Sequence, residues 1–192
     1  MSRKKGTAMV RILVPTNFSD TSQAVIRYLL PWIDAVRDEL LLLHVVPEIL
    51  SRWSDAMDTL FIEPALHDDV YRDLCEQAHW RLSNLLPPAW KGQSRAVVVV
   101  GKPAEEIVRV AREEQVDLIV MGTPKKSLWR RMLSGSVVAR VIRGTHIPVI
   151  SVANLEWPNF PPSLDNRAAL RRLMPNVGHR RSRSLGWTTQ PP

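Results

Sequence analysis

The chain has 192 residues, of which 45% are hydrophobic, so it is long enough for one domain with a sizeable core and additional tails. Its single cysteine, Cys75, excludes an internal disulfide and favours a reduced, cytoplasmic setting, with a buried thiol expected. The formal net charge is +7, yet no apolar run approaches the ~20 residues that cross a membrane, and the basic N-terminus lacks the apolar stretch of a signal peptide.

The excess positive charge lies mainly in the two terminal segments. Residues 1–8 form a basic arm, and residues 154–192 contain six arginines among many prolines and serines, a composition typical of disorder. The globular domain is therefore expected between residues 9 and 153. Basic tails attract nucleic acid or anionic lipid, but this diffuse pattern favours a solvated tail, so neither nucleic acid nor a membrane is expected as a partner.

Five short apolar runs predict β-strands. They carry almost no charge and are bounded by proline, glycine or polar residues, which is typical of strands buried on both faces of a parallel sheet. The runs span residues 9–14, 40–46, 96–100, 118–121 and 147–152.

The first helix is predicted directly after the first strand. Ser19 or Asp20 can cap it, with Gln23 as a capping-box partner. A kink or an altered turn is expected at Pro31. The apolar residues at helical spacing are Ala24, Val25, Tyr28, Leu29, Trp32, Ile33 and Val36.

Three further helices are predicted between the remaining strands. A long amphipathic helix runs from Leu66 to the prolines at 87 and 88, and another begins at Pro103, which suits a first helical turn. The last runs from Ser136 to Gly144, a glycine at the position expected for a helix C-terminus. The predicted core positions of the long helix are Val70, Leu74, Ala78, Leu82 and Leu85 or Leu86, and those of the last helix are Val137, Val138, Val141 and Ile142.

The alternation of strands and helices predicts the fold class. It indicates an α/β fold with a five-stranded parallel sheet and helices on both faces. The loop after the fourth strand delivers backbone N–H groups at a helix N-terminus, which is a place to hold an anion.

The segment after the fourth strand also contains spaced glycines. Gly122 is followed, after twelve residues, by Gly135 and Ser136. At these positions the segment resembles the universal stress proteins (UspA-like), whose motif is glycine, two residues, glycine, nine residues, glycine, then serine or threonine. Lys125 replaces the middle glycine. The resemblance covers roughly residues 10–152.

The resemblance implies a Rossmann-like fold, similar to the adenine nucleotide alpha hydrolases, with strand order 3-2-1-4-5 and a ligand crevice between the first and fourth strands. It implies a regulatory, non-enzymatic role in stress adaptation, with ATP or ADP as the ligand. It also implies a homodimer through the last strand, from Ile147 to Val152, and the apolar sheet edge independently favours such pairing.

The nucleotide-binding positions that the resemblance implies follow the first, second and fourth strands or begin the last helix. The first group would contact adenosine, a backbone group after the second strand would contact adenine, and the glycine motif would bind phosphate. These residues are Pro15, Thr16, Asn17, Val45, Met121, Gly122, Lys125, Gly135, Ser136 and Val137.

Several of these positions also have a purely structural interpretation. Asn17 stands where nucleotide-binding members have an aspartate, so it is either an uncharged acceptor for the ligand or a residue that shapes the turn. Val45 either lends backbone groups to adenine or is a core valine. His44 is expected to be packed or hydrogen-bonded, because no second ligand stands at metal spacing and no metal site is predicted.

The basic loop leaves the same two interpretations open. Gly122 either permits close approach of a ligand or ends a strand, and Gly135 with Ser136 either binds phosphate or starts a helix. Lys125 costs about 1–2 kcal/mol if the backbone there requires a positive φ. The loop cations either bind phosphate or form a solvated surface; they are Lys125, Lys126, Arg130 and Arg131.

No catalytic constellation is present in the sequence. The GxxxxGK[ST] and GxGxxG motifs are absent, and Asp20, Glu105 and Asp117 are explained by helix or strand starts. Three functions remain: weakened adenine-nucleotide binding, an interaction module with an empty crevice whose basic tails contact nucleic acid or a protein, and, third, a slow ATPase. Asn17 and Lys125 favour the module, whereas the spacing from Gly122 to Gly135 favours binding.

Overall fold

The computed structural model describes residues 9–48, 64–90, 92–123 and 136–152. Three predicted features lie outside the described residues: the N-terminal arm, the tail, and the basic loop with Lys125 and Gly135. What the sequence predicts for them stays a prediction.

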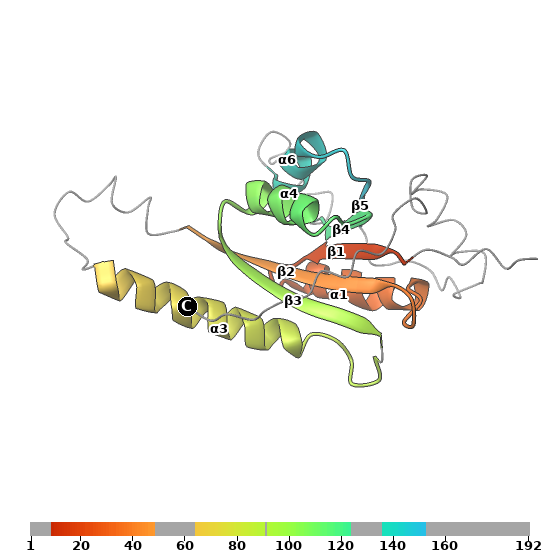
Figure 1. Cartoon of the computed structure of the whole chain (residues 1–192), viewed down its shortest axis with the longest axis horizontal. Helices are drawn as coiled ribbons and strands as arrows, with labels where there is room; N and C mark the ends of the chain where they lie inside the picture. The colour runs from red at the N-terminus through yellow and green to blue at the C-terminus, as the bar shows by residue number, and fades with distance from the viewer. Residues whose placement is uncertain (1–8, 49–63, 91, 124–135, 153–192) are drawn as a thin grey trace, which may run out of the picture.

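The described residues form one parallel sheet with strand order β3-β2-β1-β4-β5 (Figure 1), which confirms the predicted fold class and order. β1, β2 and β4 are largely buried on both faces, as predicted from their apolar runs. The same prediction is wrong for β3 and β5, which are only partly buried because they form the two edges of the sheet. Their bounds are Arg11–Pro15 for β1, Glu39–Pro47 for β2, Gln93–Gly101 for β3, Leu118–Gly122 for β4 and Val149–Val152 for β5.

Helices cover both faces of the sheet. Helices α1 and α3 lie on one face, and α4 and α6 lie on the other (Figure 1). Right-handed crossovers produce this division, since the chain moves to one side of β1 for two strands and then to the other side. The bounds are Asp20–Leu29 for α1, Leu30–Trp32 for the 3-10 helix η1, Pro64–Ser83 for α3, Pro103–Glu113 for α4 and Val137–Gly144 for α6.

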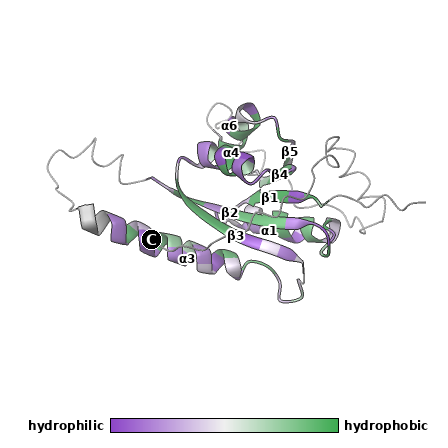
Figure 2. Ribbon diagram, viewed as in Figure 1, coloured by the Kyte–Doolittle hydropathy of each residue, from purple (hydrophilic) through white to green (hydrophobic). Residues whose placement is uncertain are grey.

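The core consists of two layers, one on each face of the sheet. Alternate residues of β1 point to opposite layers: Ile12 and Val14 pack with α1, whereas Leu13 packs with α4 and α6. Figure 2 shows the hydrophobic residues of β1 and β2 in the middle of the molecule. Burial on both faces fixes the carboxyl ends of these strands in space.

The start of α1 confirms Ser19 as the cap, one of the two predicted, and corrects the predicted capping box. Ser19 is the N-cap and accepts a hydrogen bond from the Ser22 amide at 3.4 Å. Gln23 does not close a capping box; its Nε2 donates to the Phe18 carbonyl at 2.9 Å instead. Because Gln23 lies four residues after the cap, it stands one position beyond that of a capping-box partner.

The end of α1 follows the prediction at Pro31 but not at Val36. Pro31 lies in η1, so the expected altered turn is a 3-10 helix. Val36 is 83% exposed, and its predicted place in the apolar stripe is therefore wrong. The chain has left the helix by then, and a turn in which Val36 N donates to Asp34 Oδ1 brings it to the surface.

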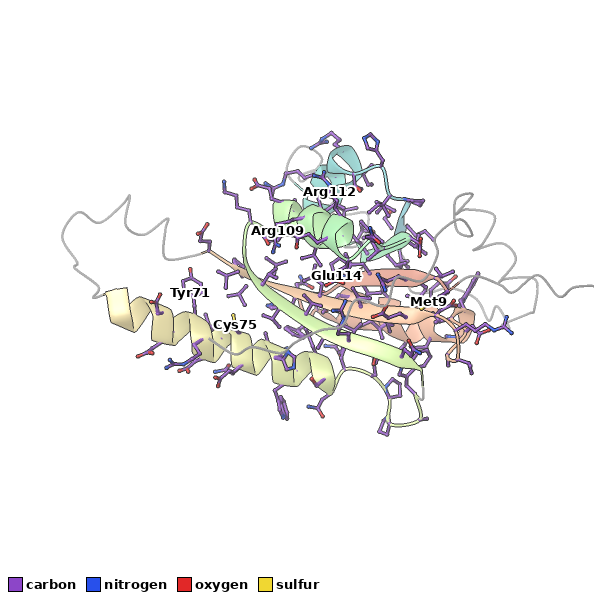
Figure 3. All side chains as sticks on the ribbon, in the orientation of Figure 1. Met9, Tyr71, Cys75, Arg109, Arg112 and Glu114 are labelled. Atoms are coloured by element: carbon purple, nitrogen blue, oxygen red, sulfur yellow. The ribbon has the colours of Figure 1, made fainter. Side chains whose placement is uncertain are left out.

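Among the residues of helix α3 whose side chains are described, the fully buried ones lie in its C-terminal half. Ala78 and Leu82 are buried as predicted, but Val70 and Leu74 are 41% and 39% exposed, which contradicts their predicted core positions. Figure 1 shows the reason, because the N-terminal half of α3 extends past the strands. Cys75 is half-buried rather than buried, and burial raises the pKa of its thiol (Figure 3).

Helix α6 differs from the prediction in two details. Val138 and Val141 are buried, but Ile142 is 51% exposed because it lies on the outer side of the helix. Gly144 is the last helical residue and does not adopt the positive φ of a terminal glycine. Its small size serves packing instead, since a Cβ there would lie 3.2 Å from Val108 Cγ2 of α4.

Candidate functional site

The candidate site lies where the sheet changes winding direction. Strands β1 and β4 are hydrogen-bonded neighbours, yet β1 leads into α1 on one face and β4 leads towards α6 on the other. In open α/β sheets, ligands bind outside the carboxyl ends of the strands at such a point. We call the residues there the switch-point site: Pro15–Phe18 at the end of β1, Val45 of β2, Met121–Thr123 at the end of β4, and Ser136–Val137 at the start of α6.

The turn after β1 is anchored by Thr16. This residue is buried; its amide donates to the Leu43 carbonyl of β2 at 2.8 Å, and its Oγ1 lies 2.8 Å from Ser22 Oγ of α1. The Phe18 amide in turn donates to Thr16 Oγ1 at 3.0 Å. Thr16 therefore joins the sheet, the turn and the helix, and the turn is held from three directions.

Asn17 shapes this turn with its side-chain oxygen. Oδ1 accepts hydrogen bonds from Ser19 N at 3.2 Å and from Ser19 Oγ at 2.7 Å. A backbone amide only donates, so the accepting atom must be the amide oxygen and not the nitrogen. The exposed side chain then offers a ligand only its NH₂ group, which has no partner among the described residues. Asn17 therefore shapes the turn, and its role towards a ligand stays a prediction.

Phe18 adopts an unusual backbone conformation. Its φ is 61°, in the left-handed region that a bulky residue rarely enters, at a cost of about 1–2 kcal/mol. Two ring contacts accompany this conformation. The His44 ring centroid lies 4.5 Å from that of Phe18, and the Arg81 guanidinium lies 3.9 Å above the Phe18 ring.

His44 is packed and hydrogen-bonded, as predicted. Its Nδ1 lies 2.8 Å from the Thr16 carbonyl, and since a carbonyl only accepts, Nδ1 carries the proton and donates. Burial lowers the pKa of His44, the hydrogen bond to Thr16 opposes this shift, and the Arg81 charge adds to it. No sequence pattern pointed to Arg81, because it lies on α3, far along the chain from this turn.

Val45 lies just past the last hydrogen bond between β1 and β2. Its side chain is in the core, as the structural interpretation expected. The Thr16–Leu43 bond shows that the backbone groups of Leu43 face β1, and those of Val45, two residues on, face the same way. The β1 ladder ends at Pro15, paired with Leu43, so the N–H and C=O of Val45 face the switch-point site.

Close packing at the end of β4 explains why a glycine stands at position 122. A Cβ at Gly122 would lie 3.1 Å from Thr21 Cγ2 and 3.2 Å from the Thr21 carbonyl oxygen of α1. The glycine therefore allows α1 to approach β4, next to the buried side chain of Met121. Sequence reasoning missed Thr123, which is 2% exposed and whose Oγ1 has no partner among the described residues.

Helix α6 begins at the switch-point site. Ser136 caps it, since its Oγ accepts from the Ala139 amide at 3.2 Å, and Val137 is the first helical residue. The helix-start interpretation of Ser136 is confirmed, while phosphate binding by Gly135 and Ser136 stays a prediction. The serine hydroxyl still has its own hydrogen to donate.

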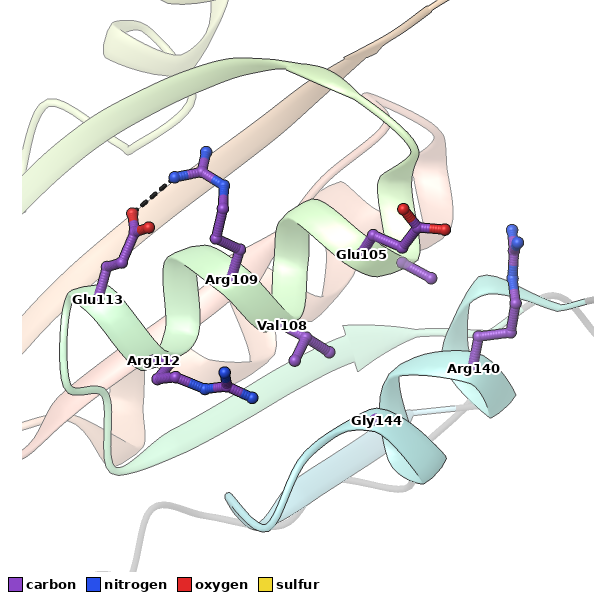
Figure 4. Close-up of a pocket in the computed structure, with 8 residues that line it drawn as sticks. Glu105, Val108, Arg109, Arg112, Glu113, Arg140 and Gly144 are labelled. Carbon is purple, nitrogen blue, oxygen red and sulfur yellow. Dashed lines mark hydrogen bonds and ion pairs between the residues drawn. The ribbon is translucent and has the colours of Figure 1, made fainter.

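Two hollows in the described part of the chain lie away from this site. One, of about 420 Å³, lies between α4 and α6, and Figure 4 shows Val108, Arg112 and Arg140 along it. Another, of about 480 Å³, lies between α3 and β3. Neither borders the switch-point site.

In the same described ranges, no three His, Cys, Asp or Glu side chains cluster to hold a metal, and no helix is long and apolar enough to cross a membrane.

Comparison with known proteins gives a consistent result. The model of the universal stress protein family matches residues 9–153. Universal stress protein MJ0577 of Methanocaldococcus jannaschii is 30% identical over 151 residues, which cover 74% of this chain and 93% of that protein. The solved structure of MJ0577 has a TM-score of 0.60 at 28% identity and covers 76% of this chain and 96% of its own. A universal stress protein solved in complex with cAMP is 24% identical over 76% of this chain and 98% of its own, with a TM-score of 0.49.

Proposed function

Because the chain belongs to the universal stress protein family, we propose that it is a regulatory domain that binds ATP or ADP at the switch-point site. The observation that carries this proposal is the backbone of Val45. The N–H and C=O of Val45 face the site, just beyond the last hydrogen bond that joins β2 to the β1 segment. The edge of adenine carries a matching pair, an amino group that donates and a ring nitrogen that accepts.

The start of α6 supports a phosphate position in the same site. The amides of the first helical turn, beginning with Val137, have no partner within the helix, and the helix dipole favours an anion there. The Ser136 hydroxyl adds a further donor. Gly135 and Lys125 complete the phosphate loop in this proposal.

The proposed binding is weak, and Asn17 supplies the reason. Its oxygen is already engaged by Ser19, so no acceptor and no negative charge remain for a hydroxyl or amino group of the ligand. A charge-assisted hydrogen bond contributes about 1.5–3 kcal/mol, or about ten- to a hundredfold in affinity. We propose a binding role and not a catalytic one, in a cytoplasmic homodimer.

Titration calorimetry with ATP and ADP tests this function. Modest binding of either nucleotide supports it, and mass spectrometry of denatured purified protein reads any nucleotide that is carried through purification. Binding tighter than micromolar would contradict the proposed weakening. Undetectable binding, even by the double variant Asn17→Asp with Lys125→Gly, would contradict the nucleotide site.

The groove between α4 and α6 favours a second candidate, an interaction module. Arg109 is neutralised by Glu106 and Glu113, both at 2.6 Å. Arg112 and Arg140 line the same groove, beside Glu105 and Glu113, and neither arginine has a carboxylate partner among the described residues. These two guanidinium groups can pair with carboxylates of an acidic protein segment. This candidate requires that a glutamate-rich peptide binds, that Arg112→Glu with Arg140→Glu abolishes binding, and that ATP and ADP do not bind.

A further inference from the structure

A stack of three side chains connects α3 to the turn after β1. Arg81 of α3 lies over one face of the Phe18 ring at 3.9 Å, and His44 of β2 lies against the same ring at 4.5 Å between centroids. His44 then donates from Nδ1 to the Thr16 carbonyl at 2.8 Å. The three residues come from three different elements, and all their contacts converge on the Thr16–Phe18 turn.

The contacts of the stack coincide with the strained residue of the turn. Phe18 is one of two non-glycine residues with positive φ in the described part of the chain, at 61°. Such a conformation persists only where surrounding contacts hold it, and these outliers gather at functional sites. Here the backbone of Phe18 is held at both ends, by its amide on Thr16 Oγ1 and by its carbonyl on Gln23.

Arg81 has no ion-pair partner among the described residues, so the contact with Phe18 is its principal interaction there. Loss of the guanidinium removes the cover from one face of the ring. The positive φ of Phe18 then loses one of the side-chain contacts that hold it, and the backbone relaxes towards negative φ more readily. The peptide groups of Thr16 and Asn17 precede it directly, so their orientation changes with it.

We propose that Phe18, His44 and Arg81 are positioning residues that hold the Thr16–Asn17 turn in its ligand-accepting shape. The proposal rests on nucleotide binding at the switch-point site and deepens it. The three side chains need not touch the ligand. They set the direction of the Asn17 amide and of the Thr16 carbonyl, and they make the affinity of the site depend on the position of α3.

Substitutions of Phe18 separate backbone shape from ring packing. Phe18→Ala and Phe18→Gly both remove the ring, but only glycine adopts a positive φ without strain. The proposal requires ATP affinity in the order wild type, then Phe18→Gly, then Phe18→Ala. If ring packing alone mattered, glycine would bind no better than alanine, and that result would overturn the proposal.

Substitutions on α3 test the role of Arg81. Arg81→Ala should weaken ATP binding about two- to fivefold, the range of an exposed cation–π contact, with little change in melting temperature. Arg81→Lys retains a cation and should restore most of the affinity. Arg72→Ala on the same helix, which removes an exposed pair with Asp69, is the matched control and should have no effect. Equal effects of Arg81→Ala and Arg72→Ala would overturn the proposal.

An NMR measurement on the full chain separates this proposal from the proposed function. If wild type binds neither ATP nor ADP, nucleotide binding fails, but the backbone shifts of Thr16 to Ser19 still report the shape of the turn. Shifts that move in Arg81→Ala and not in Arg72→Ala support the positioning role without any ligand. Unchanged shifts in both variants overturn it.

Discussion

The side-chain oxygen of Asn17 is used for hydrogen bonds within its own turn. Its oxygen accepts two hydrogen bonds from Ser19, so the atom that would replace the family's aspartate oxygen is already engaged. What remains exposed is a neutral donor. At the scale of single residues, therefore, local hydrogen bonds decide which ligand groups the site can recognise.

Replacing Asn17 with aspartate tests this point. Asn17→Asp keeps one oxygen for Ser19 and adds a second, charged oxygen that accepts from ligand hydroxyl or amino groups. We expect ATP and ADP affinity to rise about tenfold, the lower end of a charge-assisted hydrogen bond, as measured by calorimetry. Asn17→Ala should weaken binding, because it also loses the turn. Unchanged affinity in Asn17→Asp would show that charge at this position does not limit binding.

His44 predicts a pH dependence of stability. Its pKa in the folded protein is lowered, first by burial and also by Arg81, relative to an ordinary value of about 6.5. The neutral form is thus favoured in the folded state. The stability that His44 contributes to the folded protein is fully present above pH 6.5, and it is lost as the pH falls through the pKa of His44 in the folded state.

The variant His44→Asn provides the comparison, because its amide nitrogen can donate to Thr16 but does not titrate. Between pH 7.5 and pH 5, the melting temperature of wild type should fall more than that of His44→Asn. Other titrating groups are shared by the two proteins and cancel in the difference. Parallel pH profiles would contradict the assignment of the loss to His44.

Helix α3 illustrates how one element combines two environments. Its C-terminal half is anchored by Leu82, which is fully buried, whereas Leu74, two turns earlier, is 39% exposed. The sequence pattern is the same in both halves. The difference arises because the strands end before the helix does (Figure 1).

Matched leucine substitutions measure that difference. Leu82→Ala should lower the free energy of unfolding by about 2–5 kcal/mol, the usual cost of a buried leucine. Leu74→Ala should lower the free energy of unfolding by about 0.5 kcal/mol, as most surface substitutions do. Denaturant unfolding followed by circular dichroism gives both values. A similar loss in both variants would show that Leu74 is covered in solution.

At the scale of the whole molecule, β5 is an edge of the described sheet. The Pro148 carbonyl accepts from the Ile119 amide of β4, and the Val152 carbonyl accepts from the Thr123 amide just after β4. The backbone groups of Val149 and Ser151 therefore face outward. An uncovered edge favours pairing with a second copy, so the homodimer through this strand stays a prediction. The Val149 side chain packs against the core on the α4 and α6 face, so a substitution there would disturb the fold itself.

Ser151 offers a cleaner test of the dimer. Its side chain is exposed, and Ser151→Pro removes an outward N–H without removing core packing. We expect wild type and Ser151→Ala to be dimers by light scattering and Ser151→Pro to be a monomer. A full-length monomer that dimerises only after truncation at residue 154 would instead show that the tail covers the edge.

The sequence alone indicated the fold class of this protein. Short apolar runs such as residues 40–46, bounded by proline or polar residues, favour buried strands, and the proline at the start of α4 and the serine caps of α1 and α6 are local signals. Strand order came from the spacing of Gly122 and Gly135 through family resemblance.

Only the tertiary structure decided what individual site residues do. Gly122 is explained by Thr21 of a neighbouring helix, Asn17 by the geometry of its own turn, and Phe18 by Arg81 from α3. The exposure of Leu74 depends on where the strands end. Periodicity reports which side of an element faces inward, but contacts between distant segments depend on how the elements pack, and no local pattern records them.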